Sequence, residues 1–253
     1  MEKELVANGL LISYQDFGGS GESIVFLHGW RSSKEIWDGI IKRLPSGKYR
    51  ALSLDFPGFG KSPLPEKSMS VGDYAAVAAE TITKLSLGRV IIVGHSFGGR
   101  IGIKLAATRP ELVGKLILAD SAGFAMPTGK KKLLNFLAKL VRPVFRLKAL
   151  AGLRRRIYKL IGAEDYIATP KLQQTFVQVT GEDLTADMQK ISCPALIING
   201  ELDRETPPVF GRRMQALIPG SILRIIAKAG HFSFLDQPDE FLTMIGQFID
   251  AKI

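Results

Sequence analysis

Short apolar runs alternate with amphipathic stretches of helical length along most of the chain. The patterns predict strands over residues 10–14, 24–27, 49–54, 90–93, 115–119, 195–198 and 222–226, and helices over residues 35–44, 71–85, 99–107, 208–217 and 238–249. Several of the strand runs are apolar throughout, which is typical of strands that are buried on both faces of a parallel sheet. The sequence therefore predicts an α/β fold, with helices on both faces of a mostly parallel central sheet.

This alternation is interrupted between residues 122 and 182. The apolar positions there keep a helical spacing, but Pro143, Gly152 and Pro170 break the pattern into pieces. After residue 183 the alternation of strands and helices resumes. We therefore expect one core domain, formed by residues 1–121 and 183–253, with a helical cap (lid) inserted over residues 122–182.

The positive charge of the chain is concentrated in this insertion. The formal net charge is +10, and eleven of the 34 Lys and Arg residues lie between Ser121 and Ala163, where there is no Asp or Glu. Over residues 131–161 the cations alternate with apolar residues at helical spacing. Three hypotheses follow: peripheral contact with an anionic membrane, steering of acidic substrates, or a solvated outer face of a cover over the site. Because no aromatic platform or binding motif accompanies the charges, no nucleic-acid partner is expected.

The single cysteine, Cys193, excludes an internal disulfide and suggests a reducing compartment. We expect Cys193 to be a small buried apolar residue. The first residues mix charges and contain no apolar leader, and no apolar run approaches the 18 residues of a spanning helix. These features predict a soluble cytoplasmic protein, and they do not predict its oligomeric state.

The predicted strand over residues 90–93 leads into Gly94-His95-Ser96-Phe97-Gly98 and then directly into a predicted helix. A serine on a sharp turn between a strand and a helix needs flanking glycines, since side chains there would collide with the neighbouring backbone. The helix N-terminus behind the turn also favours developing negative charge. Ser96 is therefore predicted to be a nucleophile.

A serine nucleophile needs a general base, and an acid should orient that base. Of the three histidines, only His231 lies downstream of Ser96 with room for an acid between them, in the chain order Ser, acid, His. We predict His231 as the base. Asp203 is the predicted acid because it lies a few residues after the end of a strand, in a turn. Asp120, at the end of an earlier strand, and Glu201 are the alternatives.

Acyl transfer also requires N–H donors for the oxyanion of the tetrahedral intermediate. The predicted donors are the main-chain N–H groups of Phe97, which follows the nucleophile, and of Trp30, on the loop after an early strand. Gly29 would let that loop approach closely, and the Trp30 side chain would form a wall of the acyl pocket. The predicted pocket residues are His28, Gly29, Trp30, Phe97 and Phe232.

Five stretches of the chain carry a family resemblance: HGW at 28–30, DFPGFGKS at 55–62, GHSFGG at 94–99, NGELD at 199–203 and GHFSFLDQP at 230–238. With these motifs the chain resembles an α/β-hydrolase fold enzyme of the capped esterase and lipase-like group. The resemblance implies a triad of Ser96, Asp203 and His231 that works without a metal or an organic cofactor. The serine at position 96 argues against dehalogenases and epoxide hydrolases of this family, which use an aspartate nucleophile.

We therefore predict a serine hydrolase that cleaves carboxylic esters of small-molecule acyl substrates through an acyl-enzyme. A C–C bond hydrolase or a thioesterase acting on an acidic substrate is the alternative. Relatives that cleave C–C bonds often place Trp after the catalytic histidine, whereas this chain has Phe232. A non-catalytic binding module would be expected to lack part of the triad. Activity should fall as the pH drops through the pKa of His231, which is expected near 6 to 7.

Overall fold

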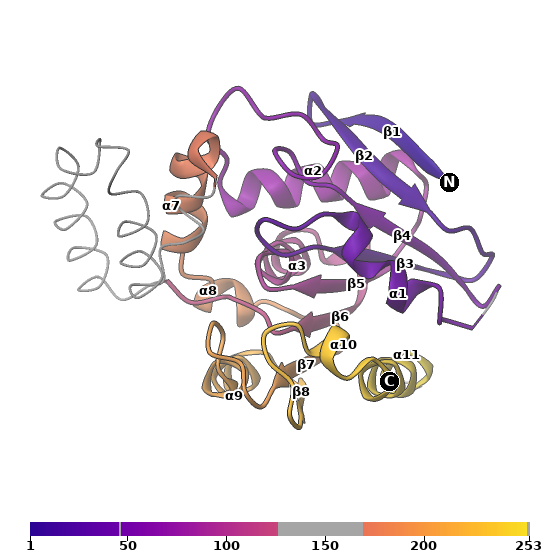
Figure 1. The fold of residues 1–253 in the computed structure, drawn as a ribbon, viewed down its shortest axis with the longest axis vertical. Coiled ribbons are helices and arrows are strands. Elements are labelled where there is room, and N and C mark those ends of the chain that lie inside the picture. The colour runs from indigo at the N-terminus through magenta and orange to yellow at the C-terminus, as the bar shows by residue number, and fades with distance from the viewer. Residues whose placement is uncertain (46, 126–168, 252–253) are drawn as a thin grey trace, which may run out of the picture.

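The computed structural model describes residues 1–45, 47–125 and 169–251 and contains one eight-stranded sheet (Figure 1). The strand order is β1-β2-β4-β3-β5-β6-β7-β8. Strand β2 pairs antiparallel with both β1 and β4, and all the other neighbours are parallel. The strands are β1 (Glu2–Ala7), β2 (Leu10–Asp16), β3 (Glu22–Leu27), β4 (Tyr49–Leu54), β5 (Val90–His95), β6 (Val113–Ala119), β7 (Ala195–Gly200) and β8 (Ile222–Ile226). The predicted α/β fold with a mostly parallel sheet is confirmed.

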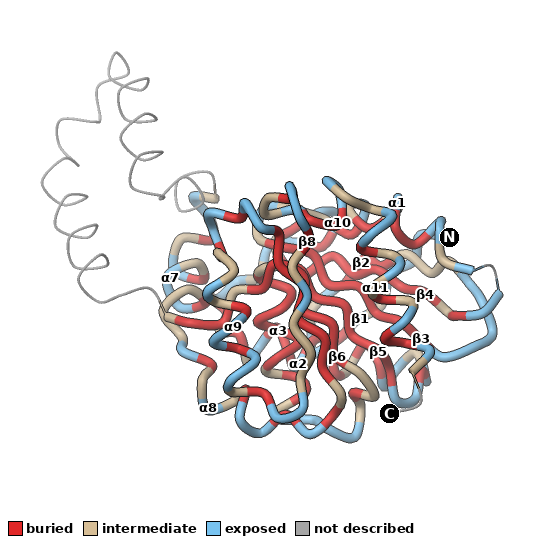
Figure 2. Tube along the Cα trace, turned by 90° about the horizontal axis from the view of Figure 1, so that it is seen from below, coloured by how far each residue is buried: buried red, intermediate tan, exposed pale blue. Residues whose placement is uncertain are grey.

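Helices cover both faces of the sheet, which is buried between them (Figure 2). Alternate side chains of β3 serve the two cores: Val25 and Leu27 face one cluster, and Ile24 and Phe26 face the other. The first face carries α2 (Val71–Lys84), α3 (Phe97–Thr108), α8 (Thr185–Met188) and α9 (Pro208–Leu217). The second carries the 3-10 turn η1 (Lys34–Trp37), α1 (Asp38–Ile41) and α11 (Pro238–Asp250). Shorter elements are η2 (Pro110–Leu112), η5 (Pro170–Leu172), α7 (Gln173–Gly181) and α10 (Ser233–Asp236).

Several elements differ from the prediction, among them the short helices α8 and α10, which were not predicted. The helix expected over residues 35–44 is a 3-10 turn followed by a four-residue helix. Gly39 and the β-branched residues after it have low helix propensity, and the tighter turn places Trp37 in the core, where it stacks on Phe234. The strand β1 was not predicted. Its side chains are mostly exposed at the sheet edge, so it lacks the apolar alternation that marks an internal strand.

Residues 126–168, with the eleven cations of the basic segment, lie outside the described residues, so the cap remains a prediction. The chain on either side of this span is held by α3. Arg100 of α3 is buried, and its guanidinium donates hydrogen bonds to the main-chain oxygens of Phe124 and Glu182. Cys193 is buried, as expected. Among the described residues, none of the helices is long and apolar enough to cross a membrane.

Candidate active site

Ser96 sits on a sharp turn between β5 and α3. Its backbone has φ 50° and ψ −106°, a conformation that L side chains rarely adopt, and α3 begins at the next residue. A Cβ on Gly94 would collide with the backbone at Gly98, and one on Gly98 would collide with the carbonyl oxygen of Leu27. The glycines on either side of Ser96 are therefore needed for the turn to pack against the end of β3. This strained turn is the local structure that the glycine spacing predicts.

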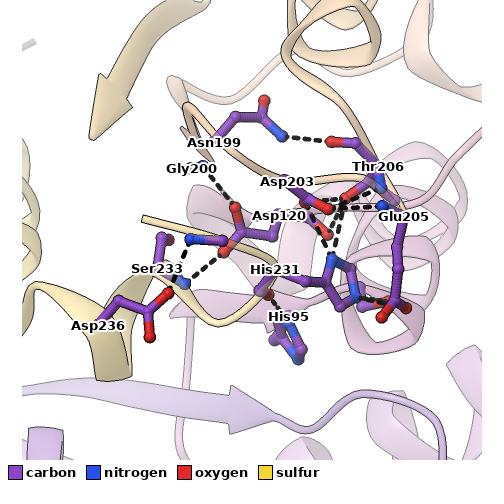
Figure 3. A network of polar contacts seen from close by, with 12 residues as sticks. His95, Asp120, Asn199, Gly200, Asp203, Glu205, Thr206, His231, Ser233 and Asp236 are labelled. Atoms are coloured by element: carbon purple, nitrogen blue, oxygen red, sulfur yellow. Dashed lines mark hydrogen bonds and ion pairs between the residues drawn. The ribbon is translucent and has the colours of Figure 1, made fainter. Parts of the chain in front are cut away.

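The predicted nucleophile, base and acid lie within hydrogen-bonding distance of one another. The Ser96 Oγ is 3.1 Å from Nε2 of His231. The His231 Nδ1 is 2.9 Å from Oδ2 of Asp203 (Figure 3). The three side chains come from the turn after β5, the loop after β7 and the loop after β8. Since these strands are parallel, their carboxyl ends meet at one edge of the sheet, where functional residues of open α/β sheets gather.

The loop between β7 and α9, residues 201–207, is called the acid loop. It is folded around the Asp203 carboxylate, which has no exposed surface. Its Oδ1 accepts hydrogen bonds from the main-chain N–H groups of Glu205 and Thr206, and its Oδ2 accepts one from the Thr206 hydroxyl at 2.6 Å. The role of Thr206 was not predicted. An Asp followed three residues later by Thr, just before two prolines and a helix, is the available signal, because Asp side chains hydrogen-bond backbone groups a few residues ahead.

The electrostatics of the pair favour an ionised acid and a basic imidazole. Burial acts to raise the pKa of Asp203, but the hydrogen bonds and charge of His231 and the hydrogen bonds of Thr206 outweigh it, so that this pKa lies below its usual value. Burial likewise acts to lower the pKa of His231. The hydrogen bond and charge of Asp203, with smaller contributions from the charges of Glu205 and Asp120, outweigh that effect and raise it.

The two alternative acids do not contact the imidazole by hydrogen bonds. The buried carboxylate of Asp120 accepts hydrogen bonds from the N–H of Gly200 at 2.7 Å and of Ser233 at 2.9 Å. It thus ties the end of β6 to the end of β7 and to the segment that follows His231. Burial raises the pKa of Asp120 to about 6. Glu201 accepts a hydrogen bond from the N–H of Lys228. Of the three candidates, Asp203 is the one placed to orient His231.

His95 precedes the nucleophile and points to the other side of the turn. Its Nε2 lies 2.8 Å from the main-chain oxygen of His231, to which it donates in the neutral form. Burial, followed by the charge of His231, lowers the pKa of His95 to about 3. A neutral His95 therefore fixes the backbone of the His231 loop, and it does not compete with His231 as a base.

The loop after β3 lies directly against the Ser96 turn. A Cβ on Gly29 would lie 2.6 Å from Nδ1 of His95 and 3.5 Å from Cβ of Ser96, so the loop approaches this closely only with glycine at position 29. Phe97 is the first residue of α3, and its N–H has no acceptor within the helix. The predicted donors, Trp30 N–H and Phe97 N–H, thus belong to two segments that meet beside Ser96.

Aromatic side chains line one side of this region. The Trp30 ring packs against Phe59, Phe97 and Phe176, with centroids 4.9, 5.2 and 5.2 Å apart. Phe176 belongs to α7, within the span of the predicted insertion, and neither it nor Phe59 was predicted. On the other side of His231, Phe232 is 39% exposed. The part these residues play in a substrate pocket remains a prediction.

His28 does not fit the prediction that it lines the pocket. It is fully buried, its Nδ1 lies 2.7 Å from the oxygen of Gly29, and its Nε2 accepts a hydrogen bond from the N–H of Phe56. Both ring nitrogens are thus used by the backbone, and burial lowers the pKa of the imidazole. His28 therefore joins the loop after β3 to the loop after β4, and its contacts fix the backbone of both loops.

One more carboxylate reaches the imidazole. Oε2 of Glu205 is 3.4 Å from Nε2 of His231, the nitrogen that also faces Ser96 (Figure 3). Glu205 belongs to the acid loop and its side chain is 65% exposed. The sequence reveals that carboxylates gather in this loop, but it contains no signal that this one turns back toward His231. The contacts thus bring together the Ser96 hydroxyl, the His231 imidazole, the buried Asp203 carboxylate and the exposed Glu205 carboxylate.

Comparisons with known proteins identify a family and similar folds. Residues 24–243 match the model of the Alpha/beta hydrolase family. The chain is 28% identical to a 2-hydroxy-6-oxononadienedioate/2-hydroxy-6-oxononatrienedioate hydrolase of Burkholderia vietnamiensis, over 95% of this chain and 91% of that protein. It is 29% identical to a pimeloyl-[acyl-carrier protein] methyl ester esterase of Nitrosomonas europaea, over 89% and 94% respectively. An esterase from Exiguobacterium antarcticum superposes with a TM-score of 0.80 at 27% identity, over 99% of this chain and 100% of that chain.

Proposed function

The chain belongs to the alpha/beta hydrolase family, and from that premise we propose that it is a serine hydrolase which cleaves carboxylic esters. The observation that carries the proposal is the continuous set of contacts from Ser96 Oγ through both nitrogens of His231 to Asp203. Such a chain of contacts converts a weak alcohol nucleophile into a reactive one, because the base accepts the proton as the bond to carbon forms.

In the proposed reaction Ser96 Oγ attacks the carbonyl carbon of the ester, while Nε2 of His231 takes its proton. Asp203 holds the imidazole by its Nδ1–H and stabilises the imidazolium. The tetrahedral oxyanion collapses and expels the alcohol, which receives the proton from Nε2. Water, deprotonated by His231, then attacks the acyl-enzyme. The second tetrahedral intermediate expels Ser96 Oγ, which takes the proton from Nε2, and the acid is released. The N–H groups of Trp30 and Phe97 bind the oxyanion in both steps, where each donor contributes roughly 10²- to 10³-fold to the rate.

The acyl group is proposed to lie against the aromatic side chains around Trp30. Phe59, Phe97 and Phe176 pack on this ring and leave an apolar environment beside Ser96, which suits a hydrocarbon acyl chain. The similarity to a methyl ester esterase and to a solved esterase agrees with an ester substrate. Contact of the basic segment with an anionic membrane, and steering of acidic substrates by it, remain separate hypotheses.

Hydrolysis of a C–C bond is a second candidate, because one of the relatives is a hydrolase of 2-hydroxy-6-oxononadienedioate and 2-hydroxy-6-oxononatrienedioate. The same serine, histidine and aspartate would be used. The two functions differ in the substrate that is turned over: an ester alone, or a dienoic ring-fission acid. Rates on both substrate types, measured with one preparation, separate them.

The test of the proposal is hydrolysis of a series of 4-nitrophenyl esters from acetate to palmitate, by the wild type and by S96A. We expect turnover by the wild type, loss of at least about 10³-fold in S96A, and an optimum in chain length. Each assay is repeated with a ring-fission acid and at low and high salt. Equal rates for S96A and the wild type would overturn the proposal, and turnover of the ring-fission acid alone would replace it by the second candidate.

A further inference from the structure

The carboxylate of Glu205 occupies a position that the proposed reaction does not use. Its Oε2 is 3.4 Å from Nε2 of His231, and Ser96 Oγ is 3.1 Å from the same nitrogen. The side chain is 65% exposed, so the carboxylate is open to solvent beside the imidazole edge that carries Nε2. Figure 3 shows it beside the ring of His231, away from Asp203.

This position lies close to the leaving group of an ester. Nε2 of His231 returns its proton to the departing alcohol, so the alcohol oxygen must come within about 3 Å of that nitrogen. A carboxylate oxygen 3.4 Å from Nε2 then lies within about 6 Å of the alcohol oxygen. A charge two or three carbons beyond that oxygen can lie within about 10 Å of the carboxylate, a distance over which two charges still interact at low ionic strength.

We propose that Glu205 determines the specificity for the leaving group, by favouring esters whose alcohol carries a positive charge near the ester oxygen over esters whose alcohol is anionic. The inference rests on the proposed function, because it concerns the same site. It adds the class of alcohol, which the family membership leaves open. The charge acts by attraction and repulsion, so neutral alcohols fall between the two.

The main chain of the acid loop is fixed at Glu205 by hydrogen bonds. The N–H of Glu205 donates to Oδ1 of Asp203 at 2.8 Å, and the next residue, Thr206, is buried and donates its hydroxyl to the same side chain. Pro207 and Pro208 then start α9. A backbone anchored in this way fixes the Cα position of Glu205, so that His231 lies within reach of its carboxylate.

The charge of Glu205 has a second consequence, at the imidazole itself. The charged groups that act on His231 are Asp203, Glu205 and Asp120, which favour the imidazolium, and the neutral His95 packs beside it. Removing the Glu205 charge should therefore lower the pKa of His231. The acid limb of the rate profile would then move to lower pH, which a residue acting only through packing would not produce.

The experiment compares three acetate esters: those of choline and 3,3-dimethylbutanol, which have the same shape, and that of 4-hydroxybutanoate, which has a similar chain length. Their alcohols are cationic, neutral and anionic. In E205Q the ratio of kcat/KM for the cationic ester to that for the anionic ester should fall by about 3- to 30-fold, with little change for the neutral ester. The effect should shrink at high salt. E201Q is the matched control, because Glu201 lies in the same loop but accepts a hydrogen bond from the Lys228 N–H.

The outcomes separate this inference from the proposed function. Neutral-ester turnover that is lost in S96A, with the same charge ratio in E205Q and the wild type, would overturn the inference alone. No turnover of any ester that depends on Ser96 would overturn the proposed function. In that case an NMR titration of His231 decides on Glu205, since its pKa should fall in E205Q and not in E201Q, and equal values in the two variants would reject the inference.

Discussion

On its Nδ1 side His231 meets a buried carboxylate, whereas on its Nε2 side it meets a hydroxyl and an exposed carboxylate. Asp203 has no exposed surface and lies 2.9 Å from Nδ1, while Glu205 is 65% exposed and lies 3.4 Å from Nε2. Solvent screens the second interaction and not the first. Two carboxylates beside one imidazole are therefore expected to have different roles: the buried one would orient the base, and the exposed one would act on the charge of an approaching substrate.

The largest effect is expected from removing the buried charge. D203N should lower kcat by up to about 10⁴-fold, because the amide no longer stabilises the imidazolium or its correct tautomer. Steady-state rates on an ester of the chain-length series provide the measurement. D120N is the comparison variant, with a far milder effect on kcat. The reverse ranking of the two variants would move the acid to Asp120.

The hydroxyl of Thr206 supports the buried side, and its loss should have an intermediate effect. T206V keeps the shape of the side chain but removes the donor to Oδ2 of Asp203, at 2.6 Å. A hydrogen bond to a charged group contributes about 1.5–3 kcal/mol, so we expect kcat to fall by about 10-fold or somewhat more. T206S restores the hydroxyl and should recover most of the rate. Equal rates for the two variants would show that the hydroxyl is dispensable.

Asp120 should affect stability more than chemistry. In D120N the amide nitrogen would face one of two N–H donors, from Gly200 and Ser233, and that buried donor would lose its acceptor. The expected loss is about 1–3 kcal/mol in the free energy of unfolding, measured by urea denaturation at pH 7. The denaturation midpoint and kcat are measured on one preparation. A drop in kcat as large as that of D203N, without a change in the midpoint, would assign Asp120 a catalytic role.

The smallest expected effect is a shift in the pH dependence of kcat/KM. It separates the charge at Nε2 of His231 from the charge at Nδ1. Because the pKa of His231 is raised above its usual 6.5, the imidazolium persists to higher pH, and kcat/KM should rise with pH through a midpoint above 6.5. In E205Q the pKa of His231 falls, so the midpoint should move to lower pH by a fraction of a unit. A rate that is flat from about pH 5 to 9, with chemistry limiting, would count against His231 as the base.

The sequence predicted the fold and the core of the site because both follow from local patterns. The apolar runs located seven of the eight strands. The glycines around Ser96 marked a sharp turn, in which a side chain at either glycine would collide with the backbone. The chain order selected His231. The sequence favoured Asp203 over Asp120 and Glu201 from its place in the turn after a strand. The three-dimensional arrangement adds that, of these three, Asp203 is the one hydrogen-bonded to the imidazole.

Other features had no local signal. His28 belongs to a motif beside the site, but its side chain is buried and both ring nitrogens are hydrogen-bonded to the backbone. Glu205 reaches His231 only because the loop after β7 folds back toward the loop after β8. The pairing of Trp30 with Phe176 joins residues far apart in the chain. Such contacts depend on tertiary packing, which the order of apolar and polar positions does not specify.

Covalent trapping tests directly whether Ser96 is a nucleophile that His231 and Asp203 activate. The wild type, S96A and D203N are incubated with a fluorophosphonate, and intact mass and peptide mapping follow the modification. We predict one phosphonyl group per chain on Ser96 in the wild type and none in S96A. Modification of D203N should be much slower, because the serine is activated through His231 and Asp203. Modification of S96A at the rate of the wild type, or of a residue other than Ser96, would contradict this prediction.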